Sequence, residues 1–279
     1  MILIALLLAL IIEQFRPDFV PDRSLAWFDN AFIRLRRYLP TQWAGPGALV
    51  WLLLPAALLT QVQSELPWWL LLPLTTFIVL LTIGDRDLQP LGEAFVHHWE
   101  AGERQQSRTV IAPLLGGDAP APPPDLVRQL FQTLIIESQQ RFFGPIFWLT
   151  LLGPAGMMLY RCSQITLHHF EPPDSAPQLL WRLLNWPVAH LTAFGYAICG
   201  SMGDMLPQWR QQPKGLDQSH ELLFVSASAA LQLGEAPFNG PEQQLAEPIA
   251  KLLTLLRYSL VLMVIGVGLF TLLQLLWIL

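Results

Sequence analysis

The chain has 279 residues, of which 53% are hydrophobic and only 13% are charged, and its net charge is −5. Soluble domains usually carry about 25% charged residues, so this composition, with a mean hydropathy of +0.41, excludes an ordinary soluble domain and indicates a membrane protein. No run of Lys or Arg suggests nucleic acid as a partner, and two cysteines are too few for a disulfide framework.

The first expected helix is the apolar run 1–12, which ends at Glu13. It lacks both the preceding positive charge and the cleavage site of a signal peptide, so we expect a retained helix, short for a full membrane span. The following region, 16–41, contains five arginines. Its apolar residues recur near helical spacing with arginines on the other side, which predicts an amphipathic helix at the membrane interface.

Two membrane spans follow as a predicted helical hairpin. Residues 38–64 are uncharged, and residues 66–84 form the returning span. We expect a short connection at 61–65, which contains no Lys or Arg.

The first long polar region is 85–141. We expect an amphipathic helix over Leu91–Ile111 and then a break, because the Gly/Pro-rich segment that follows cannot continue a helix. Asp125 is the predicted N-cap of the next helix, which runs into the centre of the chain.

The central stretch lies between Arg141 and Arg161 and has nineteen uncharged residues, Phe142–Tyr160. A helix of that length, at about 1.5 Å per residue, matches a hydrocarbon layer of about 30 Å. The two arginines are then expected as headgroup anchors at opposite ends. Small residues such as Gly144 and Gly153 would let neighbouring helices approach closely, so we predict that this span is a packing hub.

Another uncharged stretch, 183–203, is the next predicted crossing, and the second polar region, 204–257, leads into a final span from Tyr258 to the C-terminus. The Lys and Arg distribution places regions 16–41, 85–141 and 204–257 in the cytoplasm, with the N-terminus, the 61–65 turn, the 162–184 loop and the C-terminus outside. If 183–203 is only re-entrant, the C-terminal half takes the opposite orientation.

Several motifs then identify a resemblance. EAGERQQSR at 100–108, the stretch FFGPIFWLTLLGPAGMMLYR and LLNWPVAHLTA at 183–193 occur in the same order as in the AmpE family. That family is similar to the CobD/CbiB adenosylcobinamide-phosphate synthases. The resemblance covers nearly the whole chain and implies one all-α domain over 1–279, a polytopic protein with about 4–6 membrane helices.

The chain departs from the synthases where their chemistry needs acids. The synthases carry a His-Pro after the first helix, which is missing here, and an acidic cluster just before the hub, where this chain has Ile136, Glu137 and Gln140. Amide-bond formation with a nucleotide needs carboxylates that hold a metal against phosphates. The resemblance to the AmpE family is therefore the better one.

That resemblance implies an inner-membrane regulator that senses cell-wall status in β-lactamase induction, without catalysis or a cofactor of its own. Expected partners are the lipid bilayer and either a cytoplasmic anhydromuramyl-peptide amidase or a muropeptide-type ligand. Two alternatives remain: a residual or altered ATP-dependent ligase of the cobalamin type, and a transporter component, for which the spans offer few polar groups.

The candidate ligand-binding residues each have a plainer interpretation. Glu137 and Arg141 could bracket a polar ligand at one mouth of the hub or form an i,i+4 salt bridge. Arg161 marks its other mouth. His190, within an apolar span, could face a cavity or hydrogen-bond a neighbouring helix. Asn185 is expected to cap the 183–203 helix, with Pro187 in its first turn.

Two sets of residues are weak metal candidates. Glu93, His97, Glu100 and Arg104 share one face of the helix predicted over 91–111, although a solvated face with ion pairs is the simpler interpretation. His168 and His169, beside Glu171 and Asp174, could hold a cation or belong to a plain loop.

Overall fold

The computed structural model describes residues 2–15, 25–38, 44–83, 88–117, 122–169, 176–211, 215–233, 238, 241 and 244–278. Every regular element in these ranges is helical, which confirms the all-α prediction, and three helices among them are long and apolar enough to cross a membrane. The chain divides into two compact units. The first comprises Met1–Gly84, Gln140–Val188 and Ile265–Leu279, and the second comprises Asp85–Gln139 and Ala189–Val264.

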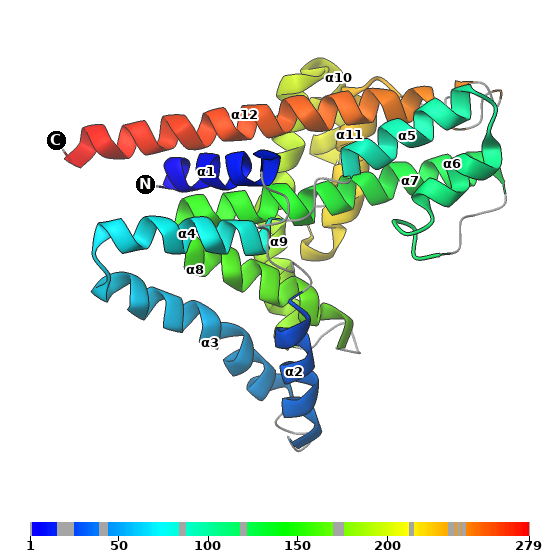
Figure 1. Cartoon of the computed structure of the whole chain (residues 1–279). Coiled ribbons are helices and arrows are strands. Elements are labelled where there is room, and N and C mark those ends of the chain that lie inside the picture. The colour runs from blue at the N-terminus through cyan, green and yellow to red at the C-terminus, as the bar shows by residue number, and fades with distance from the viewer. Residues whose placement is uncertain are drawn as a thin grey trace. The chain divides into compact units, whose positions relative to one another are not determined.

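The first unit gathers apolar helices from both ends and the middle of the chain (Figure 1). Its complete helices are α1 (Ile2–Phe15), α2 (Ala26–Tyr38), α3 (Ala44–Glu65), α4 (Trp68–Thr82) and α8 (Gly144–Thr166). It also receives the N-terminal half of α9 (Ala176–Cys199) and the C-terminal end of α12 (Glu247–Ile278).

Both predicted helices form, with a difference at the turn; α3 is long and apolar enough to cross a membrane, whereas α4 is a shorter apolar helix. Helix α3 continues to Glu65, so the expected connection at 61–65 is helical, and the chain reverses at Leu66 and Pro67. Helix α3 packs mainly against α8, whereas α4 packs against α1 and α8. The two helices follow each other in the chain as a hairpin does, and both pack against α8.

The central stretch is not one straight span, which corrects the sequence prediction. Helix α8 is interrupted at Gly153, whose φ of 68° and ψ of −162° are non-helical, and Pro154 follows directly. Gly144 and Tyr160 would be about 24 Å apart along a straight helix. Instead, a Cβ atom at Gly144 would overlap the Tyr160 ring. The chain turns back at Gly153, so α8 is a helical hairpin (Figure 1).

The fold-back moves the two flanking arginines to one end. Gln164 donates to Gln140 at 2.8 Å across the two halves of the hairpin, so Arg141 and Arg161 both lie near its base, and they are not anchors on opposite sides. Helix α8 packs against α1, α2, α3 and α4, as the packing-hub prediction requires, but the close contact of Gly144 is with Tyr160 of the same hairpin and not with a neighbouring helix. A Cβ atom on Gly156 would lie 3.0 Å from the Trp148 carbonyl oxygen, back in the first half.

The amphipathic helix predicted within 16–41 is α2, Ala26–Tyr38, while residues 16–24 and 39–43 lie outside the described part of the chain. Its apolar face is buried through Phe28, which stacks on Trp51 of α3 with ring centroids 5.6 Å apart. Its polar face carries Asp29, whose carboxylate oxygen accepts a hydrogen bond from His169 Nε2 at 2.7 Å. Burial of Phe28 and the hydrogen bond between Asp29 and His169 therefore both fix α2 on the first unit.

The second unit contains α5 (Leu88–Glu100), α6 (Arg104–Ile111), α7 (Pro123–Ser138), α10 (Met202–Gln211) and α11 (Ser219–Ala230), with parts of α9 and α12. The single helix predicted over 91–111 is wrong. Gly102, with a φ of +79°, ends α5 and turns the chain into α6. Asp125 is not an N-cap either, because α7 already begins at Pro123 and Asp125 lies within its first turn.

Both polar regions of the sequence meet in this second unit. Phe131 of α7 is fully buried, and its ring contacts Phe224 of α11 and Phe238 edge-on, with centroids 5.7 and 5.4 Å apart. Gly92 of α5 lies against Leu253 of α12. Residues of regions 85–139 and 204–257 therefore pack on each other within this unit.

Helices α9 and α12 differ from their predictions at their starts. Helix α9 begins at Ala176, seven residues before the expected 183, so Asn185 and Pro187 lie inside it and Asn185 is not a cap. Helix α12 begins at Glu247 and continues through the predicted final span. From Tyr258 onward one face of α12 is exposed and carries large hydrophobic residues, Tyr258, Val261, Ile265, Leu269, Leu272 and Leu276.

Candidate functional site

The candidate site lies at the base of the α8 hairpin, where the helix enters and leaves. The five residues Gln139–Phe143 before α8 form a π-helical turn. Pro145 causes it, because proline has no N–H to bond the carbonyl four residues back and its ring crowds that carbonyl. Single π turns occur often at functional sites because they rotate the following side chains out of register.

Three side chains form a hydrogen-bonded chain across this base. The guanidinium of Arg161 donates through Nη1 to Gln164 Oε1 at 2.6 Å. The amide of Gln164 donates in turn to Gln140 Oε1 at 2.8 Å. All three side chains are half-buried. The fold-back at Gly153 is what brings Gln140 within reach of the second half of α8.

A second polar pair lies deeper, between α8 and α9. The Tyr160 hydroxyl donates to Asn185 Oδ1 at 3.0 Å, and both residues are buried. Trp148 Nε1 donates to the Leu184 carbonyl at 3.1 Å, and the Trp181 ring lies 5.0 Å from that of Tyr160. These contacts fix the N-terminal half of α9 against the base of the hairpin.

The base offers N–H donors and one fixed positive charge. A guanidinium has five N–H donors and suits carboxylates and phosphates, and primary amides both donate and accept. Carboxylates, which hold Mg²⁺, are absent from this hydrogen-bonded chain of Gln140, Arg161 and Gln164. The arrangement is therefore suited to an anionic or amide-containing ligand.

The predicted site residues are only partly brought together. Arg161 and Asn185 both contribute to the base, with Arg141 in the adjacent π turn. His190 belongs to the second unit, where its ring lies 6.4 Å from Trp209 of α10. Glu137 lies in the last turn of α7, two residues before the π turn begins. The salt bridge or ligand contact predicted for Glu137 and Arg141 stays a prediction.

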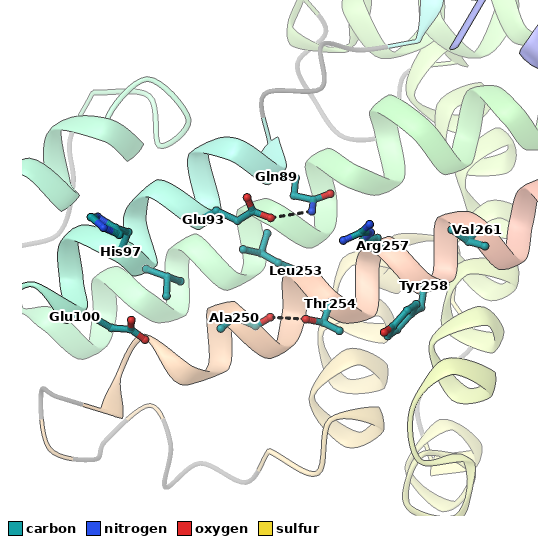
Figure 2. A pocket seen from close by; sticks show the side chains of 11 residues that line it. Gln89, Glu93, His97, Glu100, Ala250, Leu253, Thr254, Arg257, Tyr258 and Val261 are labelled. Carbon is teal, nitrogen blue, oxygen red and sulfur yellow. Dashed lines mark hydrogen bonds between the residues drawn. The ribbon is translucent and has the colours of Figure 1, made fainter. Parts of the chain in front are cut away.

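Of the four residues predicted to share one helix face, the fold keeps three together and separates Arg104 from them. Arg104 leaves the face shared by Glu93, His97 and Glu100, because α5 ends at Glu100 and the guanidinium lies 3.9 Å from the Trp99 ring centre. The other three line a groove of about 700 Å³ against α12 (Figure 2). In the ranges that the structure describes, no three His, Cys, Asp or Glu residues are grouped to hold a metal ion.

The second predicted cation site is only partly described. His169 is engaged by Asp29, and its carbonyl accepts a hydrogen bond from Arg36 Nη1. Glu171 and Asp174 lie outside the described residues.

Sequence reasoning missed Gln140, Gln164 and Tyr160 as site residues. A signal was present: Gly153 and Pro154 together in the middle of an apolar stretch permit a reversal, because glycine adopts positive φ and proline cannot continue the hydrogen-bond ladder.

Comparison with known proteins gives one distant relative. The chain is 27% identical over 202 residues to the cobalamin biosynthesis protein CobD of Stutzerimonas stutzeri (strain A1501), a match that covers 67% of this chain and 65% of the relative. No protein-family model matches, and no solved structure matches. The chain thus spans about two thirds of the relative's length. This protein is a helical membrane protein similar to CobD, and the comparison supports the CobD/CbiB-like part of the resemblance only.

Proposed function

We propose that the protein is a multi-pass sensor of the bacterial inner membrane that relays cell-wall status in β-lactamase induction and catalyses no reaction itself. The observation that carries this proposal is the chain of Arg161, Gln164 and Gln140 at the base of the α8 hairpin. It presents amides and a guanidinium where metal-dependent ligation of a nucleotide would need carboxylates. A muropeptide, with its carboxylates and amide groups, is the ligand class that this donor set fits.

The relay would run through α9. Its buried Asn185 accepts from Tyr160, one residue before Arg161, so ligand binding at Arg161 shifts the contact that holds α9. Helix α9 contributes residues to both units. A cytoplasmic partner, such as an anhydromuramyl-peptide amidase, would then respond to the second unit, where both polar regions are packed together.

The proposed topology places the base of α8, the 162–175 segment and both polar regions in the cytoplasm. Gln140 and Gln164 lie side by side, so the chain leaves α8 on the side where it entered. Because regions 85–139 and 204–257 share one packed unit, α9 then starts and ends on the same side and does not cross. The turn after α3 and the tip at Gly153 face outside.

Reporter insertions test this topology against a straight central span. Sandwich insertions after residues 117, 169 and 233 should all report a cytoplasmic position. A periplasmic reporter after residue 169 would contradict the re-entrant hairpin and favour a straight crossing with its arginines on opposite sides.

The sensor role is tested with Arg161→Gln in a strain that lacks the chromosomal copy. Loss of the positive charge should lower inducible β-lactamase by about tenfold, the equivalent of one charge-assisted hydrogen bond of about 1.4 kcal/mol. Arg210→Gln is the matched control, because Arg210 is an exposed cation on α10. Equal induction in both variants, at equal amounts of membrane-inserted protein, would refute the role.

The second candidate is a residual or altered ATP-dependent ligase, and the similarity to CobD favours it. Titration of the detergent-extracted protein with ATP and Mg²⁺ distinguishes the ligase from the sensor. The sensor proposal expects no saturable binding up to about 1 mM nucleotide, the upper end of ordinary substrate affinities. Saturable, magnesium-dependent binding below that concentration would favour the ligase.

A further inference from the structure

The second unit contains a groove between α5 and α12 that the hairpin site does not use. The groove has a volume of about 700 Å³, within the range of small-molecule sites. Gly92 brings α5 against α12 at Leu253, which forms the floor. The two walls are Gln89, Glu93, Val96, His97 and Glu100 on α5 and Ala250, Leu253, Thr254, Arg257, Tyr258 and Val261 on α12.

Charges are ordered along this groove. Figure 2 shows His97 and Glu100 at the end beside Ala250, and Arg257, Tyr258 and Val261 at the other end. Glu93 lies between them and accepts a hydrogen bond from Gln89 at 2.9 Å. Glu93, Glu100 and Arg257 are exposed to solvent. One end of the groove is therefore acidic and the other is basic.

The basic end is also the end that continues into the apolar face of α12. Before Arg257 this helix buries its apolar residues, including Leu252, Leu253 and Leu256. From Tyr258 onward its exposed residues are large and hydrophobic, with Val261 52% exposed. An exposed apolar face of this length fits lipid acyl chains, and arginine and tyrosine are typical of the level where headgroups begin. The groove thus leads from headgroup level outward into water.

We propose that this groove binds the headgroup of a zwitterionic phospholipid that bears a primary ammonium group. The phosphate lies at Arg257, next to the acyl chains that run along Val261. The ammonium group extends toward Glu93 and Glu100. In such a lipid the phosphate is nearer the acyl chains and the ammonium is farther out, which is the order of charges along the groove. Specificity for a primary ammonium follows because its three N–H donors can bond carboxylates, whereas a quaternary ammonium has none.

Native mass spectrometry of the full-length protein tests the proposal, with added phosphatidylethanolamine or phosphatidylcholine of identical acyl chains. The wild-type protein should retain phosphatidylethanolamine about tenfold more strongly. The double variant Glu93→Gln with Glu100→Gln should bind both lipids equally, and Arg257→Gln should weaken both. Glu221→Gln and Arg210→Gln, exposed charges on α11 and α10, should behave like the wild-type protein.

Two outcomes would overturn the proposal: equal retention of both lipids by the wild-type protein, or an unchanged preference in the double variant. A third arm adds soluble glycerophosphoethanolamine, which lacks acyl chains and should not displace the lipid at equal concentration. Displacement at equal concentration would assign the groove to a soluble phosphate ester and refute the lipid. These outcomes are independent of the induction assay, because Arg161 is not part of the groove.

Discussion

Different kinds of contact hold the helices together inside each of the two units. In the first, the α8 hairpin closes through glycine against Tyr160 and through hydrogen bonds between amides. In the second, α7 and α11 meet where the fully buried ring of Phe131 contacts the half-buried ring of Phe224 edge-on. Lipid provides no hydrophobic drive between helices, so close approach and hydrogen bonds must hold them. In water, burial of aromatic surface provides the drive. The contacts in the first unit are therefore of the kind expected between helices in lipid, and those in the second are of the kind expected in water.

The substitution with the largest expected effect on the free energy of unfolding is in the second unit. Phe131→Ala removes a ring that is fully buried between Phe224 and Phe238, and should lower the free energy of unfolding by about 3–5 kcal/mol. Denaturant titration in detergent measures it. The control is Phe194→Ala, because Phe194 is 43% exposed and leaves no cavity. Similar losses in the two variants would contradict an aromatic core.

The stability of the first unit should be reduced more by side-chain atoms added at its close contacts than by atoms removed from them. Gly144→Ala places a methyl group into the Tyr160 ring and should cost about 3 kcal/mol through overpacking. The same substitution made in a Tyr160→Leu background should cost much less, because the ring is gone. A double-mutant cycle measures the difference. An equal cost in both backgrounds would show that the contact does not limit stability.

The next largest loss of stability is expected at Gly153, in the turn at the tip of the α8 hairpin. Gly153→Ala forces a Cβ atom onto a backbone with a φ of 68° and a ψ of −162°, a region essentially restricted to glycine, at a cost of about 2 kcal/mol. Gly195→Ala is the matched control, because a Cβ atom there meets nothing within 4 Å and alanine favours a helix. A thermal-shift series should lower the melting temperature for the first variant only.

What the sequence predicts well is what depends on local pattern. Composition and apolar periodicity are sufficient for the helical class and for α2, α3, α4 and the final helix, because each is set by its own residues. The density of small residues in the centre correctly predicts a place of close packing. Such features need no knowledge of which segments meet.

The sequence does not predict where a helix is interrupted by a change in backbone dihedral angles, or which other helix it contacts. Nineteen uncharged residues have the length of a straight span, so length alone concealed the reversal at Gly153. Helical periodicity likewise continues across Gly102, and the predicted 91–111 helix therefore ran through a turn. The contact of Asn185 with Tyr160 joins two helices, so local capping rules could not reveal it.

The smallest expected effect concerns the water-facing contact between α10 and α11. Asp204 accepts hydrogen bonds at one carboxylate oxygen from Ser201 Oγ and Gln232 Nε2, both at 2.6 Å. These bonds, first that from Ser201, lower the pKa of Asp204. A carboxyl whose folded pKa is below its unfolded value near about 3.9 stabilises the fold above that pH, and the contribution is lost as the pH falls through the folded pKa.

Acidification from pH 5 toward pH 3 should therefore loosen the C-terminal end of α11 in the wild-type protein. Hydrogen exchange at the Leu231 amide, which donates to the Ala227 carbonyl, should speed up beyond the intrinsic pH effect. Asp204→Asn should remove this extra pH dependence, because the amide does not titrate, whereas Glu221→Gln on α11 should retain it. Because Asp204 is fully exposed, solvent screens the contribution, and the unit should stay folded throughout. Unfolding of the whole unit over this range would instead mean that buried carboxyls elsewhere control its acid stability.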